Sequence, residues 1–470
     1  MTDLNNNETV PKEIKKVPIM AVLLIGAFVA ILNQTLLATA LPPIMEDLKI
    51  TANTAQWLTT IFMLVNGIMI PITAFLVETF TTRKLFLTAI ITFALGTLIC
   101  AITPSFPILM AGRIIQASAA GVMMPLMQTI VLLIFPIEKR GTAMGLIGLV
   151  ISFAPAIGPT LSGFMVDHFH WRTLFYIVFP IAILDIIFAY FVLKNVTKQH
   201  YPKVDSISII LSTLGFGGIL YGFSSAGNIG WSSMPVILTM TVGAICLLFF
   251  AIRQFQLSQP ILELRVFKYK VFTLTTGIGM LVFMSMIGGA TILPIYMQDM
   301  RDFSATESGL MMLPGAVLMG IMSPISGRIF DKIGARKLSL AGLALMTISN
   351  IMYTDLTTTT SFTYMTVMYL LRMAGIAMVM MPVTTAGLNQ LPKHLIPHGT
   401  AVNNTMRQVS GSIGTALLVT VMTTAALGEG PNMNAEAMIH GVNMSFWAAF
   451  IFGFVGFVLS FFIKKKPAES

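Results

Sequence analysis

Long apolar segments, separated by short polar loops, follow one another along the whole chain. A helix needs roughly 20 apolar residues to cross the hydrocarbon core of a bilayer, and fourteen segments approach or exceed that length. They are residues 17–41, 53–76, 85–103, 106–131, 141–163, 172–193, 206–226, 233–252, 271–297, 305–326, 338–354, 362–385, 400–426 and 442–463. Transmembrane helices tolerate internal Gly and Pro. The pattern therefore predicts an all-α integral membrane protein with fourteen transmembrane helices.

Positive charges are distributed very unevenly between the loops. If both termini are cytoplasmic, almost all of the 28 Lys and Arg residues fall on the cytoplasmic side. The exceptions are Lys49, Arg172 and Arg301 outside, and Arg113, Arg372 and Arg407 within apolar segments. Cytoplasmic loops carry an excess of Lys and Arg, and one missed segment would invert every later loop. The charges thus predict fourteen spans with both termini in the cytoplasm.

The composition excludes a water-soluble protein. Hydrophobic residues make up 56% and charged residues 10% of the chain, with a mean hydropathy of +0.84, whereas soluble domains are about 25% charged. The net charge of +9 comes from the loops and gives no reason to expect nucleic acid. All six His residues are expected in loops, so no metal site is predicted. The sequence contains no phosphate-binding glycine loop with a lysine, and we expect neither a cofactor nor an enzyme.

The two ends of the chain contain similar motifs. Arg113 precedes Met123-Met124-Pro125 as Arg372 precedes Met380-Met381-Pro382, and Gly141-Thr142-Ala143 matches Gly399-Thr400-Ala401. A nearly constant offset predicts two parallel six-helix bundles, an architecture of transporters in which the substrate site lies at mid-membrane between the halves. We expect the N-terminal bundle at residues 1–193, the inserted seventh and eighth spans with their linkers at 194–265, and the C-terminal bundle at 266–470.

The loop after the tenth segment, residues 327–337, has the sequence GRIFDKIGARK. An aspartate at a helix end can bind an arginine and the N-terminus of a neighbouring helix. Such contacts would break when two halves move apart, so Gly327, Asp331 and Arg336 are predicted gate residues. Ordinary loop charge is the alternative. The first-half copy, AFLVETFTTRK, adds Glu78 and Arg83.

The fourth and fifth segments carry the other two motifs. An arginine within a span costs ~2.5–3.5 kcal/mol and usually faces the bundle interior, and Arg113 shares one helical stripe with Gln116, Met124 and Gln128. It is predicted either to couple protons or to be held structurally by backbone carbonyls. In the fifth segment, small residues permit close helix approach and prolines bend the helix. The residues concerned are Pro155, Gly158, Pro159 and Gly163.

In this order, the motifs resemble the major facilitator superfamily, and within it the fourteen-span drug:proton antiporters, above all the bacterial lincomycin-type multidrug exporters. The resemblance covers essentially the whole chain. It implies the major facilitator fold, a gating role for the 327–337 loop, proton transfer at Arg113 and export by way of the Gly158-Pro159 antiporter motif. The first-half gate copy departs from the family pattern, with Ala74 for Gly and Glu78 for Asp, which puts its latch in doubt.

Many members of that family carry an aspartate in the first span, where this chain has Asn33. A proton-coupled antiporter still needs a titratable group. Asp185 lies in the middle of the sixth segment and Glu307 begins the tenth. Intramembrane carboxylates are functional candidates by default, so both are predicted coupling residues, with a structural or interfacial role as the alternative.

The predicted substrate site is rich in amides and methionines and poor in acids. Such a site favours neutral, zwitterionic or anionic amphiphiles over dications, and flexible Met side chains suit promiscuous binding, although packing is the alternative for most of them. The candidates are Asn33, Gln34, Gln56, Trp57, Met63, Asn66, Gln116, Met124, Met284, Met312, Met381, Asn404 and Arg407.

These features together predict a monomeric, multi-pass protein of the plasma membrane. Its expected function is efflux of amphipathic drugs in exchange for protons, by rocking of the two bundles; its partners are then the lipid bilayer, protons and small amphipathic molecules. Two alternatives remain: a dedicated exporter of one endogenous lipid or metabolite, and a membrane sensor that has lost transport.

Overall fold

The computed structural model describes residues 15–197, 199–200, 204–428 and 434–464. In these residues the chain forms fourteen α-helices joined by short loops and four 3-10 turns, and no strand. Residues 1–14 and 465–470 lie outside the described part. The two chain termini, which the charges place in the cytoplasm, are among these residues.

The helices match the predicted segments in order and extend most of them by a few residues. The first seven are α1 (Lys16–Leu48), α2 (Ala52–Thr79), α3 (Thr82–Ile102), α4 (Phe106–Ile134), α5 (Arg140–His168), α6 (Thr173–Val192) and α7 (Ser206–Ile229). The remaining seven are α8 (Met234–Gln256), α9 (Lys270–Asp299), α10 (Ala305–Ile333), α11 (Ala335–Met352), α12 (Phe362–Leu388), α13 (Ile396–Gly428) and α14 (Ala435–Ser460).

Thirteen of the helices are long and apolar enough to cross a membrane. The exception is α11, which has only 18 residues and carries Arg336 and Lys337 in its first turn. Two charged residues lower the mean hydropathy of so short a helix considerably. The count of fourteen spans therefore stays a prediction, whereas the all-helical membrane architecture is confirmed.

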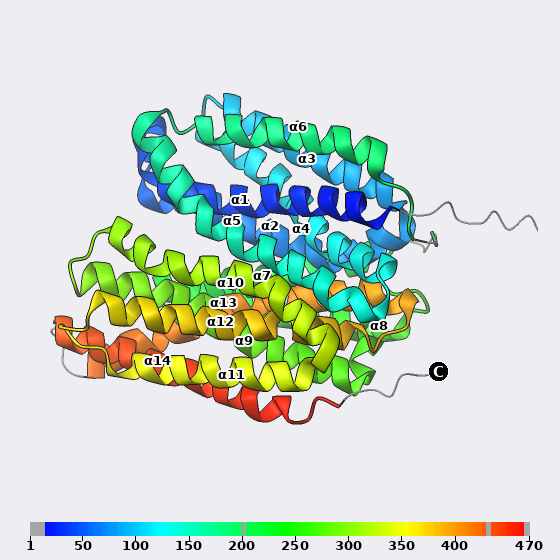
Figure 1. The fold of residues 1–470 in the computed structure, drawn as a ribbon. Coiled ribbons are helices and arrows are strands. Elements are labelled where there is room, and N and C mark those ends of the chain that lie inside the picture. Colours follow the sequence, from blue (N-terminus) through cyan, green and yellow to red (C-terminus); the bar gives the residue numbers. More distant parts are fainter. Residues whose placement is uncertain (1–14, 198, 201–203, 429–433, 465–470) are drawn as a thin grey trace, which may run out of the picture.

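The helices form two layers along a common axis (Figure 1). Helices α1–α6 make one layer and α9–α14 make the other, while α7 and α8 form a pair beside them, in which α7 packs against both α2 and α13. Successive helices run in opposite directions, so α1 begins and α14 ends at the same end of the molecule. We call this end, where α2, α4, α6, α10 and α12 also finish, the terminal end, and the opposite one the distal end.

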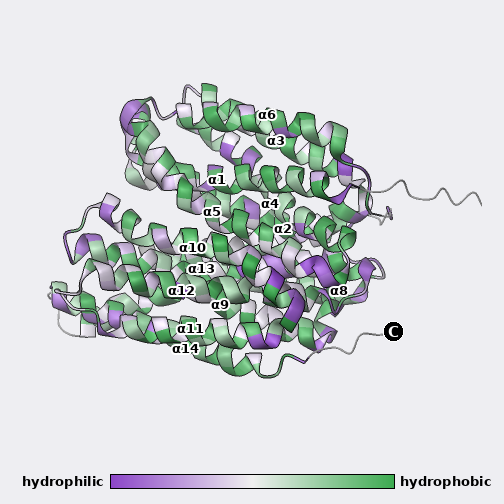
Figure 2. Ribbon diagram, in the orientation of Figure 1, coloured by the Kyte–Doolittle hydropathy of each residue, from purple (hydrophilic) through white to green (hydrophobic). Residues whose placement is uncertain are grey.

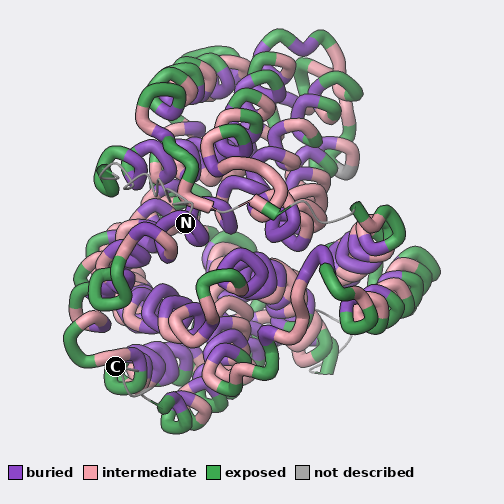
Figure 3. The backbone as a smooth tube through the Cα atoms, turned by 90° about the vertical axis from the view of Figure 1, so that its right-hand side faces the viewer, coloured by how far each residue is buried: buried purple, intermediate pink, exposed green. Residues whose placement is uncertain are grey.

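Hydrophobic residues prevail along most of the helices, and many hydrophilic ones gather toward their ends (Figure 2). Large apolar side chains such as Phe191, Leu248 and Phe454 are exposed, while buried residues gather inside the helix bundles (Figure 3). A belt of exposed apolar side chains suits a lipid solvent, in which helices satisfy their own backbone hydrogen bonds.

Helices α7 and α8 are tied together at the terminal end by one ion pair. Arg253 near the end of α8 donates from Nε and Nη2 to the carboxylate of Asp205, which precedes α7, at 2.7 and 2.8 Å. The Arg253 guanidinium, helped by the Ser208 hydroxyl, lowers the pKa of Asp205 to about 2. Trp231, at the other end of the pair, donates to Thr420 of α13 at 2.6 Å. The inserted pair is thus held together at the terminal end and joined to α13 at the distal end.

Candidate functional site

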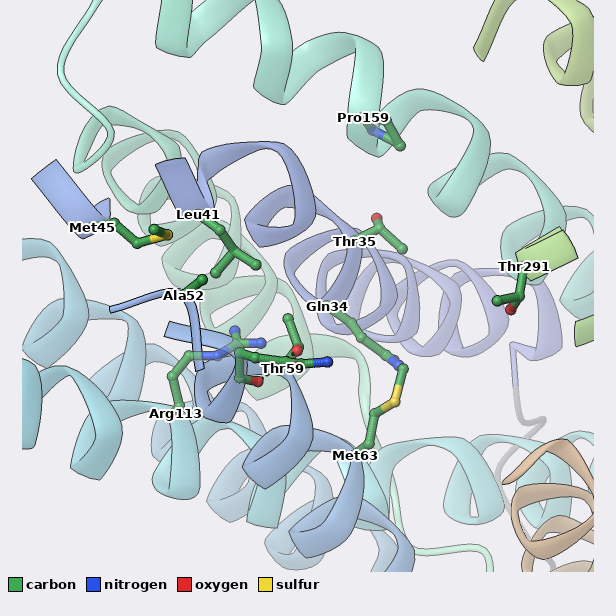
Figure 4. Close-up of a pocket in the computed structure, with 11 residues that line it drawn as sticks. Gln34, Thr35, Leu41, Met45, Ala52, Thr59, Met63, Arg113, Pro159 and Thr291 are labelled. Atoms are coloured by element: carbon green, nitrogen blue, oxygen red, sulfur yellow. Dashed lines mark hydrogen bonds between the residues drawn. The ribbon is translucent and has the colours of Figure 1, made fainter. Parts of the chain in front are cut away.

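A cavity of about 810 Å³ lies at the distal end between α1, α2, α4, α5 and α9. Its depth follows from its lining: Met45 and Ala52 flank the α1–α2 turn at the distal end, whereas Met63 lies in the middle of α2. The lining residues are Gln34, Thr35, Leu41, Met45, Ala52, Gln56, Thr59, Met63, Arg113, Pro159 and Thr291. Figure 4 shows Arg113 and Thr291 on opposite sides of the space.

The lining combines amides, hydroxyls and thioethers with one cation. No carboxylate occurs among these residues in the described part of the chain. Gln34, Gln56, Met63 and Arg113 were predicted site residues, and Pro159 belongs to the predicted antiporter motif. Thr59, which the sequence did not single out, lies three residues after Gln56 and four before Met63, so helical spacing places all three on one face. For Thr291 of α9, no predicted site residue at helical spacing pointed to the cavity.

Arg113 is completely buried in the wall of this cavity. Its Nε donates to the carbonyl of Leu58 at 3.3 Å, and its Nη1 to the carbonyl of Asn33 at 3.5 Å and to Oε1 of Gln116 at 3.0 Å. The guanidinium also lies over the ring of Phe62, 4.2 Å from its centre. Within the described residues Nη2 has no hydrogen-bond partner. Arg113 is therefore held by neutral groups alone and retains one free donor.

Three other predicted substrate residues lie near the cavity without lining it. Asn33 and Gln116 are buried beside Arg113, and Trp57 is 41% exposed and stacks on Tyr221 of α7 at 5.8 Å. The indole therefore contacts the inserted helices rather than the cavity.

The remaining predicted substrate residues serve helix packing in this conformation. Asn66 of α2 packs against Gly121 of α4, and Asn404 donates to Gln128 across the two layers at 2.7 Å. Arg407 lies over the ring of Phe283, 4.9 Å from its centre. The methionines pack against the helical core: Met124, Met284, Met312 and Met381. Substrate contact by this group would require another conformation, and stays a prediction.

At the terminal end the two layers are held together by Asp331. Its carboxylate, at the end of α10, accepts hydrogen bonds from the backbone N–H groups of Gly141 and Thr142 in the first turn of α5, both at 2.8 Å. The hydroxyl of Thr142 donates to the same carboxylate at 2.6 Å. A Cβ atom at Gly327 would collide with the carbonyl of Gly141, so this approach requires glycine.

Glu78 makes a second link between the layers at this end. Its Oε1 lies 2.9 Å from Nε2 of His398 in α13, and the backbone N–H of Glu263 donates to Nδ1 of the same ring at 3.2 Å. His398 is thus buried inside a helix, not in a loop as predicted. His440 likewise lies within α14. The other two predicted gate arginines begin helices at the same end: Arg83 stacks on Tyr190 of α6, within one layer, and Arg336 is exposed.

Further pairs reinforce the contact between the layers on the terminal side. Arg140 donates to Asn389 at 2.8 Å, and the hydroxyls of Thr129 and Thr400 are 2.6 Å apart. All of these links lie toward the ends of α2, α4, α10 and α12 or the starts of α5 and α13. The molecule is therefore closed at the terminal end and hollow at the distal end.

The two acidic candidates have very different surroundings. Asp185 of α6 is completely buried, and both carboxylate oxygens have no partner among the described residues. It faces α1, where a Cβ atom at Gly26 would be 2.8 Å from Oδ2. Glu307 instead closes a capping box with Ser304 at the start of α10, accepting from its backbone N–H at 2.8 Å. A capping box satisfies exposed helix-end groups, which gives Glu307 a structural task.

The antiporter motif of α5 faces α1 at its glycine and the cavity at its second proline. A Cβ atom at Gly158 would collide with Oγ1 of Thr35, so glycine permits the two helices to touch beside the cavity. Pro159 lines the cavity. Pro155 is exposed, and a Cβ atom at Gly163 would meet nothing within 4 Å. Close approach thus explains Gly158 and not Gly163.

Several bacterial transport proteins are similar to this chain over almost its full length. The MFS-type transporter YcnB of Bacillus subtilis (strain 168) is 57% identical, covering 99% of both chains. Lincomycin resistance protein LmrB of the same organism is 42% identical, covering 97% of this chain and 98% of that protein. Multidrug export protein EmrB of Escherichia coli (strain K12) is 29% identical over 93% and 88%.

The fold of a solved transporter structure and a family sequence profile both match this chain. The crystal structure of the human organic anion transporter MFSD10 (TETRAN) superposes with a TM-score of 0.69 at 14% identity, covering 95% of this chain and 99% of that one, which shows the fold alone. The sequence profile of the Major Facilitator Superfamily matches residues 23–415. The chain therefore belongs to the Major Facilitator Superfamily and is a multi-pass transporter of the plasma membrane.

Proposed function

We propose that this chain is a proton-coupled antiporter that exports amphipathic drugs by alternating access. The printed names of its relatives, lincomycin resistance and multidrug export, support drug efflux. The observation that carries the proposal is the distal cavity together with the closed contact at the terminal end. A site open to one side and sealed on the other suits a transporter whose two repeats rock about a central site.

The orientation of the cavity follows from the charge distribution. With fourteen spans and cytoplasmic termini, the terminal end is cytoplasmic, so the structure faces outward. Asp331 and Glu78 then close the cytoplasmic side. The moving bodies are the bundles at 1–193 and 266–470, which must separate at these contacts before drug enters from the cytoplasm, while 194–265 accompanies them as the inserted pair.

Proton coupling is assigned to Asp185 and Arg113. A buried carboxyl with no partner can gain or lose a proton without breaking a fixed ion pair, and its energy then depends on how the helices around it move. Arg113 lines the cavity from α4, and α4 belongs to the same six-helix bundle as α6, which carries Asp185. Drug entering beside Arg113 could therefore shift the bundle in which Asp185 is enclosed.

The cavity is lined by a single chain, so a monomer suffices to form it, and its side chains suit the binding of many different ligands. Met45 and Met63 offer flexible, polarizable contacts, and the amides of Gln34 and Gln56 can each donate and accept hydrogen bonds. None of the lining side chains demands one shape of ligand. These properties favour many amphiphiles over a single endogenous compound.

Transport by purified protein in proteoliposomes tests the proposal. With an imposed pH gradient, we expect uphill movement of several unrelated amphipathic drugs and dissipation of the gradient by each drug. Movement of one compound class alone would establish a dedicated exporter. No movement of any compound, by protein that still binds drug, would indicate a sensor and contradict the proposal.

A further inference from the structure

Arg113 is a buried cation without a counterion. Its hydrogen-bond acceptors are two backbone carbonyls and one side-chain amide, and its remaining contact is the ring of Phe62. Leaving a buried charge without its partner costs ~3–5 kcal/mol. Neutral acceptors and an aromatic face recover only part of that cost.

Asn33, the residue of α1 that contacts Arg113 through its backbone, does not supply the missing charge. Asn33 is 1% exposed, and both polar atoms of its side chain are without partners among the described residues. Its backbone carbonyl already contacts Nη1 of Arg113. The residue of α1 whose backbone contacts the guanidinium is thus uncharged, and no acid lines the cavity within the described part of the chain.

The corresponding arginine of the second half, Arg372, is also held by neutral groups and also has one guanidinium nitrogen, Nη1, without a partner among the described residues. Arg372 donates from Nε to Oδ1 of Asn350 at 3.0 Å and from Nη2 to the backbone and hydroxyl oxygens of Ser285. It is completely buried and does not line the cavity. Of these two arginines, only Arg113 has both a guanidinium nitrogen without a partner and a place in the cavity wall. Two other lining side chains, Gln56 and Thr59, are exposed and half-buried respectively. They can therefore change rotamer and let a ligand reach Arg113.

We propose that the cavity selects amphipathic ligands that carry a carboxylate, and that this carboxylate is the counterion of Arg113. The ligand accepts a charge-assisted hydrogen bond from Nη2, while its apolar part lies among Met45, Leu41 and Met63. This inference rests on the proposed transport function and narrows its substrate class. The ligand thus supplies the negative charge beside Arg113 that no side chain of the cavity wall provides.

Binding to purified full-length protein in detergent tests the proposal with one matched set of probes. The set is a pyrene-labelled fatty carboxylate, its methyl ester and its trimethylammonium analogue. We expect the wild type to bind the carboxylate at least ~10-fold more tightly than the ester, equivalent to about 1.4 kcal/mol. Equal binding of carboxylate and ester, or tighter binding of the ammonium probe, would overturn the inference.

Two charge variants make the test independent of misfolding. Asn33→Asp places a fixed carboxylate beside Arg113 and should abolish the preference for the anionic probe, while the ester still binds. Asn350→Asp adds the same charge beside Arg372, away from the cavity, and should retain the preference. A preference that survives in Asn33→Asp, or is lost equally in Asn350→Asp, would contradict the assigned counterion.

The outcome is separable from that of the proposed function. If proteoliposomes export neutral or cationic drugs while carboxylate and ester bind equally, the transporter proposal stands and the anion preference fails. If the carboxylate binds preferentially and nothing is transported, the counterion assignment stands and the transport proposal fails.

Discussion

Asp331 and Thr142 are joined by two hydrogen bonds that cross between the layers, from the Thr142 backbone N–H at 2.8 Å and from its hydroxyl at 2.6 Å. Asp331 lies at the end of α10, and Thr142 lies in the first turn of α5. The carboxylate therefore also meets the partial positive charge of a helix N-terminus, which stabilises an anion by ~0.3–1 kcal/mol, and up to ~2 kcal/mol when partly buried. This contact seals the terminal end.

Asp331→Asn should weaken that seal, because an amide offers no charge to the N-terminus of α5 and one of its two positions donates instead of accepting. We expect drug efflux to fall several-fold at normal expression, and a cysteine introduced near Thr142 to react faster with a water-soluble thiol reagent. Asp299→Asn, an exposed acid at the distal end, is the control. Efflux and labelling equal to the wild type would remove Asp331 from the gate.

Arg113→Ala should abolish proton-driven exchange, and Arg113→Lys should restore only part of it. Lysine keeps the charge but lacks the planar fork that reaches Leu58, Asn33 and Gln116 simultaneously. The measurement is drug-driven proton movement in proteoliposomes, with membrane insertion and thermal stability followed in parallel. If both variants exchange protons at the wild-type rate, Arg113 has only a structural role.

Asp185→Asn should preserve drug binding and eliminate drug-induced proton release. The side chain has no hydrogen-bond partner among the described residues to lose, so an amide of the same shape should fit, while the titratable proton disappears. Proton release can be followed with a pH-sensitive dye in weakly buffered detergent solution. Glu307→Gln, at the other acidic candidate, is measured in parallel and should retain drug-induced proton release if Asp185 is the carrier. Undiminished release from well-folded Asp185→Asn protein would rule out Asp185 and make Glu307 the next candidate.

Asp205→Asn should lower the melting temperature of the purified protein at neutral pH by loosening α7 from α8. The folded-state pKa of Asp205, about 2, is below the ordinary value of about 3.9. The ion pair therefore stabilises the fold fully above that ordinary value, and its contribution is lost as the pH falls through about 2. The wild type and the variant should differ at pH 7 and converge between pH 4 and pH 2. A difference independent of pH would exclude the carboxylate as its cause.

The sequence by itself determined the helices, their order and the family. Segments of about 20 apolar residues have few alternatives in a bilayer, because every backbone group must be satisfied within the segment. It also identified Arg113, Gln34, Gln56 and Met63 as site residues, since polar or flexible side chains are conspicuous within apolar runs, and it marked Asp331 through the composition of its loop.

The tertiary structure decided which side of each helix faces the cavity. A transmembrane helix is apolar toward lipid and toward its neighbours, so hydrophobic periodicity does not distinguish the two faces. Trp57 consequently contacts Tyr221 instead of the cavity, and Thr291 enters the lining from a distant helix. The link from Glu78 to His398 joins residues 320 positions apart, and only packing of the two layers brings them together.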